Sequence, residues 1–86
     1  MKFNLDRLIK LGLIRKIPKS RLKAKESIKT AESWLIEAEN NFVNKTFRSC
    51  VLSSYLAMFH AARATLFADG FREKSHFAVA RYLEDK

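Results

Sequence analysis

Cysteine, proline and glycine are scarce in this chain of 86 residues, which has one cysteine, one proline and two glycines. The single cysteine, Cys50, excludes a disulfide bond within the chain and is typical of proteins from a reducing compartment. With so little glycine and proline, tight β-hairpins are hard to build, and no run of alternating β-branched residues competes with a helical pattern. These scarcities favour an all-α fold.

Long apolar runs are also absent. Hydrophobic residues make up 48% of the chain, but charged residues interrupt them before they reach the roughly 18 residues that a membrane span needs. Charges are scattered through the first residues, so they do not form a cleavable signal. We therefore predict a cytoplasmic protein without a membrane-embedded part.

The chain has few residues that bind metals or phosphates in known motifs. Two histidines and one cysteine, without the spacing of a zinc motif, supply too few metal ligands. The sequence also has no glycine-rich phosphate-binding loop and no motif that pairs a catalytic nucleophile with a general base. We expect neither a metal nor another cofactor.

Positive charge is concentrated at the amino-terminal end. The net charge is +8, and residues 1–25 carry all of it, with nine Lys or Arg against one acid, whereas the remaining 61 residues balance eight bases with eight acids. We divide the chain into a basic leader, residues 1–19, and a helical bundle, residues 20–86. The leader could contact nucleic-acid phosphates or acidic membrane lipid, remain a solvated arm, or pack Leu5, Leu8 and Ile9 on a partner.

Apolar spacing and capping residues predict four helices. A short helix follows Asn4 and ends at Gly12, and a long one starts at the cap Ser20 and runs to about residue 43. A turn at residues 44–46 joins it to a second long helix, residues 46–68. Residues 71–74 are predicted as a loop, and Ser75 as the cap of a short last helix.

The second long helix carries two apolar faces, one of bulky and one of small side chains. Almost every side of it therefore needs cover, and we predict that residues 47–68 are nearly fully buried. One long and two short helices are too few to provide that cover. We expect it to come from another subunit, or the chain to be a truncated piece of a longer domain. The residues predicted to pack against other helices or a second subunit are Ser54, Tyr55, Ala57, Met58, Phe59, Ala61 and Ala64.

The segment S-Y-L-A-M-F-H-A-A-R-A at residues 54–64, followed by Gly70-Phe71 and Lys74-Ser75-His76, resembles the HEPN family of small prokaryotic helical proteins. The A-E-S-W-L-I-E-A-E segment at residues 31–39 and the basic leader are similar to one branch of that family. The resemblance implies an antiparallel up-and-down bundle and frequent homodimers. It also implies partnership with a minimal nucleotidyltransferase in toxin–antitoxin pairs, and binding of nucleotide or RNA.

Many HEPN proteins are metal-independent ribonucleases that use an Arg and a His separated by four to six residues. This chain lacks that motif, because only three residues separate Arg72 from His76 and His60 precedes Arg63. We therefore favour a non-catalytic or weakly catalytic module. The alternative is a ribonuclease toxin whose Arg72 and His76 assemble a catalytic site across a dimer interface.

Two groups of residues are candidates for binding an anion such as a nucleotide. His60 and Arg63 lie three apart on one helix and therefore point to neighbouring positions. A basic turn with a hydroxyl precedes the last helix, where free N–H groups favour an anion. Our hypothesis is that the two groups converge at one end of the bundle, although either could be an ordinary solvated or packed group. The turn consists of Arg72, Lys74, Ser75 and His76.

Overall fold

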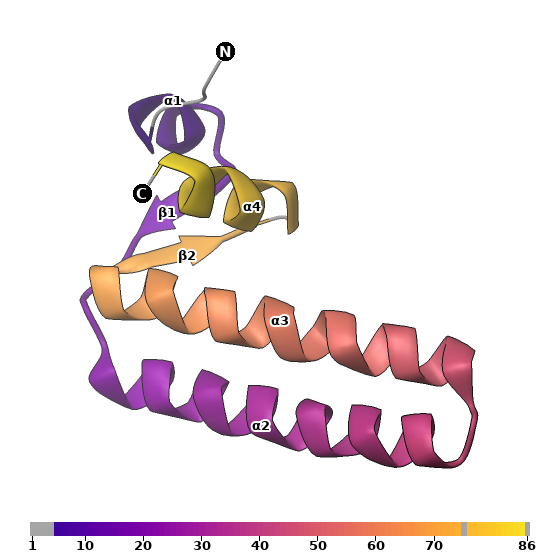
Figure 1. Cartoon of the computed structure of the whole chain (residues 1–86). Coiled ribbons are helices and arrows are strands. Elements are labelled where there is room, and N and C mark those ends of the chain that lie inside the picture. Colours follow the sequence, from indigo (N-terminus) through magenta and orange to yellow (C-terminus); the bar gives the residue numbers. More distant parts are fainter. Residues whose placement is uncertain (1–4, 75, 86) are drawn as a thin grey trace.

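The computed structural model describes residues 5–74 and 76–85, in which two long helices lie side by side (Figure 1). The long helices are α2 (Arg21–Val43) and α3 (Phe47–Asp69). The shorter elements are α1 (Leu5–Lys10), β1 (Ile14–Lys16), β2 (Phe71–Glu73) and α4 (His76–Asp85). This arrangement confirms the prediction of an all-α helical bundle with two long helices flanked by short ones.

Capping groups set the ends of the long helices where the sequence predicts them. The Ser20 side chain accepts a hydrogen bond from the Lys23 amide at 3.1 Å and begins α2. The Thr46 hydroxyl donates to the backbone oxygen of Asn41 at 3.0 Å and fixes the turn before α3. Gly70 ends α3 in the left-handed conformation, with φ at 87°. The short turn at residues 44–46, between the end of α2 and the start of α3, makes these two helices antiparallel neighbours.

Small residues make the contact between α2 and α3. Ala31 and Ala38 of α2 and Ala64 of α3 are buried. At the far end of the hairpin, the Asn41 amide donates to the buried Ser53 hydroxyl at 3.0 Å, and the Cys50 thiol lies 3.4 Å from the Ala38 backbone oxygen. These side chains are short, so they let the two helices pack side by side; of the small-residue face expected from the sequence, Cys50 and Ala64 lie in this contact, whereas Ala61 is exposed.

A two-stranded antiparallel sheet joins β1 to β2, so the prediction of a loop at residues 71–74 is wrong for its first three residues. The register pairs Ile14 with Glu73 and Arg15 with Arg72. The Lys74 amide extends the ladder by donating to the Leu13 oxygen at 2.8 Å. Each strand is three residues long, and its pairing depends on a partner far away in the chain, so no local pattern indicates it.

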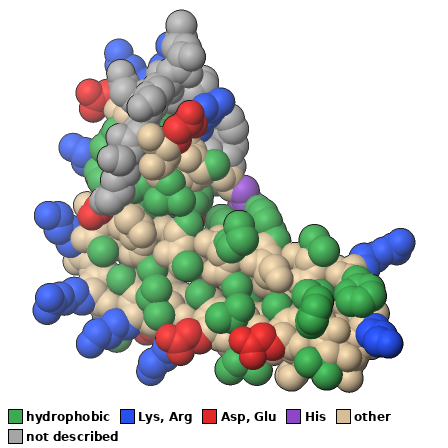
Figure 2. All heavy atoms as spheres, viewed as in Figure 1, with side chains coloured by type: hydrophobic (Ala, Val, Ile, Leu, Met, Phe, Trp, Pro, Cys, Tyr) green, Lys and Arg blue, Asp and Glu red, His purple; other side chains and the backbone are tan. Residues whose placement is uncertain are grey.

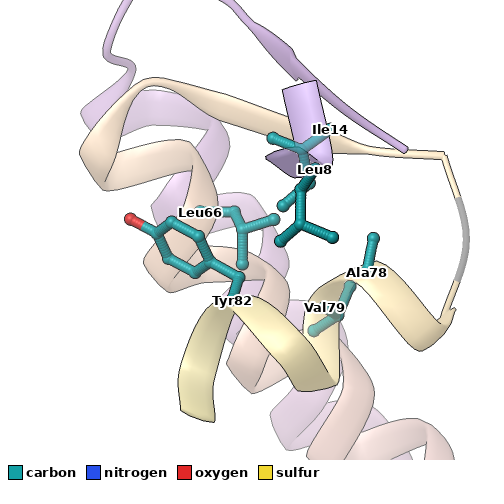
Figure 3. Packing of buried hydrophobic residues seen from close by; sticks show 6 residues of the cluster. All are labelled: Leu8, Ile14, Leu66, Ala78, Val79 and Tyr82. Carbon is teal, nitrogen blue, oxygen red and sulfur yellow. The ribbon is translucent and has the colours of Figure 1, made fainter. Parts of the chain in front are cut away.

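The main hydrophobic core lies between α1, β1, α4 and the end of α3 (Figure 3). Its buried side chains are Leu8, Ile14, Leu66, Ala78, Val79 and Tyr82. The Tyr82 hydroxyl donates to the Asp69 carboxylate, and the pKa of Tyr82 is raised by burial and then by this hydrogen bond. The leader thus packs Leu8 into the core of its own chain.

The prediction that residues 47–68 are nearly fully buried is wrong for the single chain. The short elements dock at the end of α3 that contains Leu66, and they leave the other end uncovered (Figure 1). Val51 and Met58 are 71% and 70% exposed. Among the described residues, none of the helices combines the length and apolar character that crossing a bilayer requires.

Gly70 and Gly12 offer a matched pair of substitutions. Both have positive φ, but an added Cβ at Gly70 would lie 3.0 Å from the Ile17 backbone oxygen, whereas one at Gly12 would meet nothing within 4 Å. Gly12→Ala should therefore lower the free energy of unfolding only by the backbone strain, about 1–2 kcal/mol. We expect Gly70→Ala to lose about 1 kcal/mol more, because backbone must move. Urea denaturation of both variants measures the difference, and equal losses would contradict the close approach of residue 17.

Candidate functional site

A surface pocket of about 270 Å³ lies where the first half of α2, the last part of α3 and β2 meet. We call this pocket the basic hollow. Three elements that are distant in the sequence supply its side chains, so it exists only in the folded chain. Its lining residues are Lys23, Glu26, Ser27, Thr30, His60, Arg63, Phe67 and Arg72.

Arg63 is held in place by an ion pair with Glu73 of β2. Arg63 Nε lies 2.7 Å from Glu73 Oε1, and the two side chains are 24% and 6% exposed. Both atoms are buried, and neither has a hydrogen-bond partner among the described residues, so the contact between them is an ion pair and not a well-aligned hydrogen bond. Each charge therefore depends on the other, and the pair joins α3 to the sheet.

Two cations of the hollow share one aromatic ring. Arg63 Cζ lies 5.2 Å and Lys23 Nζ 5.9 Å from the centre of the Phe67 ring, which is itself buried. The electron-rich face of a ring attracts a cation at this distance. Lys23 of α2 and Arg63 of α3 therefore both lie near the Phe67 ring.

His60 lines the same hollow as a neutral group. Burial lowers the pKa of His60, and the positive charge of Arg63 lowers it further, against a smaller opposing effect of Glu73. At neutral pH the imidazole is therefore uncharged and offers one hydrogen-bond donor and one acceptor.

Arg72 extends the positive charge onto the sheet. It is exposed, and the strand register places it directly opposite Arg15, which is also exposed. Like charges in directly opposed positions destabilise a strand pair. The pair concentrates positive charge at the rim of the basic hollow.

The structure brings together only part of the predicted anion site. His60, Arg63 and Arg72 line one hollow. His76 instead packs against α3, with its ring centre 4.2 Å from that of Phe59 and its Nδ1 hydrogen-bonded to the Tyr55 hydroxyl. Lys74 is exposed beyond the sheet, and Ser75 lies outside the described residues. Arg72 and His76, the alternative catalytic pair, thus contact different surfaces of the chain.

Sequence reasoning missed the contribution of α2 to the hollow. Lys23, Ser27 and Thr30 follow one another at spacings of four and three, which places them on one helical face. That spacing was readable in the sequence. Its relation to His60 and Arg63 was not, because it depends on the register of the two antiparallel helices.

A second feature is an apolar groove of about 360 Å³ between α2 and α3. Figure 2 shows hydrophobic side chains along both helices of the hairpin. Phe42 and Phe47 contact each other edge to face, with centres 6.2 Å apart, and are exposed at the far end. The groove is lined by Ile28, Ala31, Glu32, Leu35, Ala57, Met58 and Ala61.

The residues predicted for helix packing fall on different surfaces. Ala57, Met58 and Ala61 line the apolar groove, and Ala64 is buried. Tyr55 and Phe59 lie on another side, against His76. Ser54 is half-buried.

The family model of the HEPN domain matches residues 24–86. The chain belongs to the HEPN family. Neither curated proteins nor solved structures give a match. The residues of this HEPN domain that match the family model include α3, β2 and α4. The helix α1 and the strand β1 lie outside the match. Among the described residues, no three His, Cys, Asp or Glu side chains are grouped so that they could hold a metal ion.

Proposed function

We propose that this HEPN domain is a non-catalytic module that forms homodimers through the apolar groove and works with a nucleotidyltransferase in a toxin–antitoxin pair. The observation that carries the proposal is the uncovered apolar face of the hairpin. Leu35, Val51 and Met58 are between 51% and 71% exposed there. Burying such a side chain from full exposure is worth about 1.5–3 kcal/mol, and half or more of that gain is still available at each of these residues, so a partner that covers them gains binding energy from this face.

A second copy of the chain suits the groove for a geometric reason. Small side chains, Ala57 and Ala61, lie beside bulky ones, Leu35 and Met58. In a twofold dimer the same patch meets itself, so the bulky residues of one protomer can enter the small-residue positions of its partner. Glu32 supplies the one charge of the lining, which leaves the rest free to lose water.

The non-catalytic assignment rests on the spacing of Arg and His. Only three residues separate Arg72 from His76, and the contacts of His76 with Tyr55 and Phe59 hold it on another surface than Arg72. Support for the nucleotidyltransferase partner comes from the family. If the adjacent open reading frame encodes such an enzyme, we expect the two proteins to co-purify. RNA cleavage by the purified protein that disappears in His76→Ala would support the ribonuclease alternative.

Leu35 and Ile36 provide a matched test of dimerisation. Both are aliphatic, neighbours in α2 and similarly exposed, at 51% and 59%, but Leu35 lines the groove and Ile36 does not. We expect Leu35→Asp to weaken the dimer by at least about tenfold, because its carboxylate would lose water in the interface. Light scattering and sedimentation over a concentration series measure this.

Ile36→Asp is the control and should dimerise like the wild type. A wild-type chain that stays monomeric at high concentration, or two variants with equal effects, would contradict the proposed interface. Since both side chains are already exposed, neither substitution should unfold the protomer.

A further inference from the structure

We propose that the side of the hairpin that carries the basic hollow is a docking surface for an amphipathic helix of another protein, one that has carboxylates at its first turn and aliphatic side chains after them. The surface consists of the basic hollow and the apolar residues that continue it toward the turn of the hairpin, and we call it the mixed face. Those apolar residues are Trp34 of α2 and Leu52 and Leu56 of α3. The proposal concerns a surface outside the apolar groove and does not depend on the dimer.

Helical spacing places these apolar residues in line with the basic hollow. Along α3, Leu52 and Leu56 precede His60 at successive spacings of four, so the three form one row. Along α2, Trp34 follows Thr30, another residue of the hollow, by four. Because α2 and α3 are antiparallel, both rows run from the hollow toward the turn at residues 44–46. The mixed face is therefore one continuous strip along the hairpin.

The apolar part of the mixed face is accessible to a partner. Leu52 is 59% exposed, and Trp34 and Leu56 are half-buried. The short elements dock at the other end of α3, where Leu66 lies. At 1.5 Å per residue, the row from Leu52 to Arg63 is about 16 Å long, which a partner helix of about three turns matches. Such a helix would remove the remaining apolar surface of this row from water.

The charges of the hollow suit carboxylates. Arg63 is neutralised by Glu73 at 2.7 Å, so it adds shape and little net charge. Lys23 and Arg72 are then the effective cations of the lining, and Glu26 is the one opposing acid. A guanidinium can bind both oxygens of one carboxylate with parallel hydrogen bonds. One or two carboxylates on the partner are therefore enough to balance the hollow.

The rest of the mixed face disfavours a nucleic-acid backbone. Residues 31–44 and 49–62, which form most of the hairpin beyond the hollow, contain no Lys or Arg. Glu26, Thr30 and Glu37 are exposed and follow one another at spacings of four and seven, so the two acids border the strip on one side of α2. A chain of phosphates gains its affinity from cations along its whole path. A polypeptide needs them only at its acidic end, and a Lys or Arg farther along it would face Glu37.

A synthetic helical peptide of about 12 residues is the probe, with two Glu in its first turn, Leu in the middle and one Lys in its last turn. Fluorescence anisotropy measures its affinity for the full chain, and amide chemical shifts show where it lies. We expect Lys23→Gln and Arg72→Gln to weaken binding by about tenfold each, because each removes a charge-assisted contact. Lys29→Gln is the control: Lys29 is an exposed lysine of α2 outside the hollow, and its loss should change affinity by less than about twofold.

Leu52 and Val51 are a matched pair for the apolar part. They are neighbours in α3 and are 59% and 71% exposed, but consecutive residues of a helix point in directions about 100° apart. We expect Leu52→Ser to weaken peptide binding by about tenfold and Val51→Ser by less than about twofold. Both side chains are exposed, so neither substitution should unfold the chain. Equal effects of the two substitutions would overturn the proposal.

Three further outcomes decide against the mixed face. One is the absence of peptide binding. Another is unchanged affinity of a peptide whose two Glu are replaced by Gln, since this would show apolar adhesion without recognition of carboxylates. The third is a short single-stranded RNA that binds at the same ionic strength with the same dependence on Lys23, Arg72 and Leu52, which would assign the surface to nucleic acid.

The dimer and the docking surface can fail separately. Leu35→Asp alters the apolar groove, which shares no lining residue with the basic hollow. We expect that variant to bind the peptide like the wild type, whether or not the chain forms dimers. Loss of peptide binding in Leu35→Asp, with the fold retained, would place the peptide in the apolar groove and overturn the proposal.

Discussion

Replacing Leu66 with alanine should lower the free energy of unfolding by about 3–5 kcal/mol, the largest effect we expect from one substitution. Leu66 is fully buried, at 0% exposure, and lies among Leu8, Ile14 and Val79 in the hydrophobic cluster that joins α1, β1, α3 and α4. Removing its side chain loses apolar burial and leaves a cavity that rigid neighbours cannot fill. A loss of this size is a large part of the total stability of a small domain.

Urea denaturation at one fixed protein concentration measures this loss, because any dimer makes stability depend on concentration. Leu22→Ala is the control: Leu22 is 68% exposed in the first turn of α2, and its truncation should cost less than about 1 kcal/mol. If Leu66→Ala does not fold, Ile14→Val tests the same cluster with an expected loss of about 0.5–1.5 kcal/mol. Similar losses for Leu66→Ala and Leu22→Ala would show that the cluster is not the core.

The ion pair between Arg63 and Glu73 should give the second largest effect, and an asymmetric one. Glu73 is 6% exposed and Arg63 24%, so an unpaired carboxylate would be more deeply buried than an unpaired guanidinium. We expect Arg63→Met to cost about 3 kcal/mol, near the lower end for a buried charge without its partner. Glu73→Gln should cost about 1–2 kcal/mol, since Arg63 can turn toward water.

The double variant Arg63→Met/Glu73→Leu separates the pair from its surroundings. Both charges are then absent, so we expect it to be more stable than Arg63→Met alone. Equal costs for the two single substitutions, or a double variant that loses the sum of both, would contradict the coupling. Denaturation curves of the four proteins supply the cycle.

Local signals account for the part of the fold that was predicted. The boundaries of α2 and α3 follow from Ser20, the turn at residues 44–46 and Gly70, all of which act on residues nearby in the sequence. The sheet was missed because β1 and β2 are short and are separated in the sequence by the whole α2–α3 hairpin. Their pairing is a tertiary event with no sequence period of its own.

The candidate site was likewise predicted where it depends on local spacing in the sequence and missed where it depends on tertiary contacts. His60 and Arg63 were recognised as neighbours because three residues on a helix bring them to one side. Lys23 joins them through the register of two antiparallel helices, and Arg72 through the sheet. The burial of α3 was overestimated because an apolar face predicts only that cover is needed, and the short elements of this chain dock at one end.

The sheet also affects where the boundaries of a recombinant fragment of this domain should be placed. The family match starts at residue 24, but Leu8 and Ile14, two of the three largest fully buried side chains, lie before that point. A recombinant fragment designed from the matched region alone would expose Leu66 and leave β2 as an unpaired edge. Its insolubility would then reflect the choice of boundary and would say nothing about the stability of the hairpin.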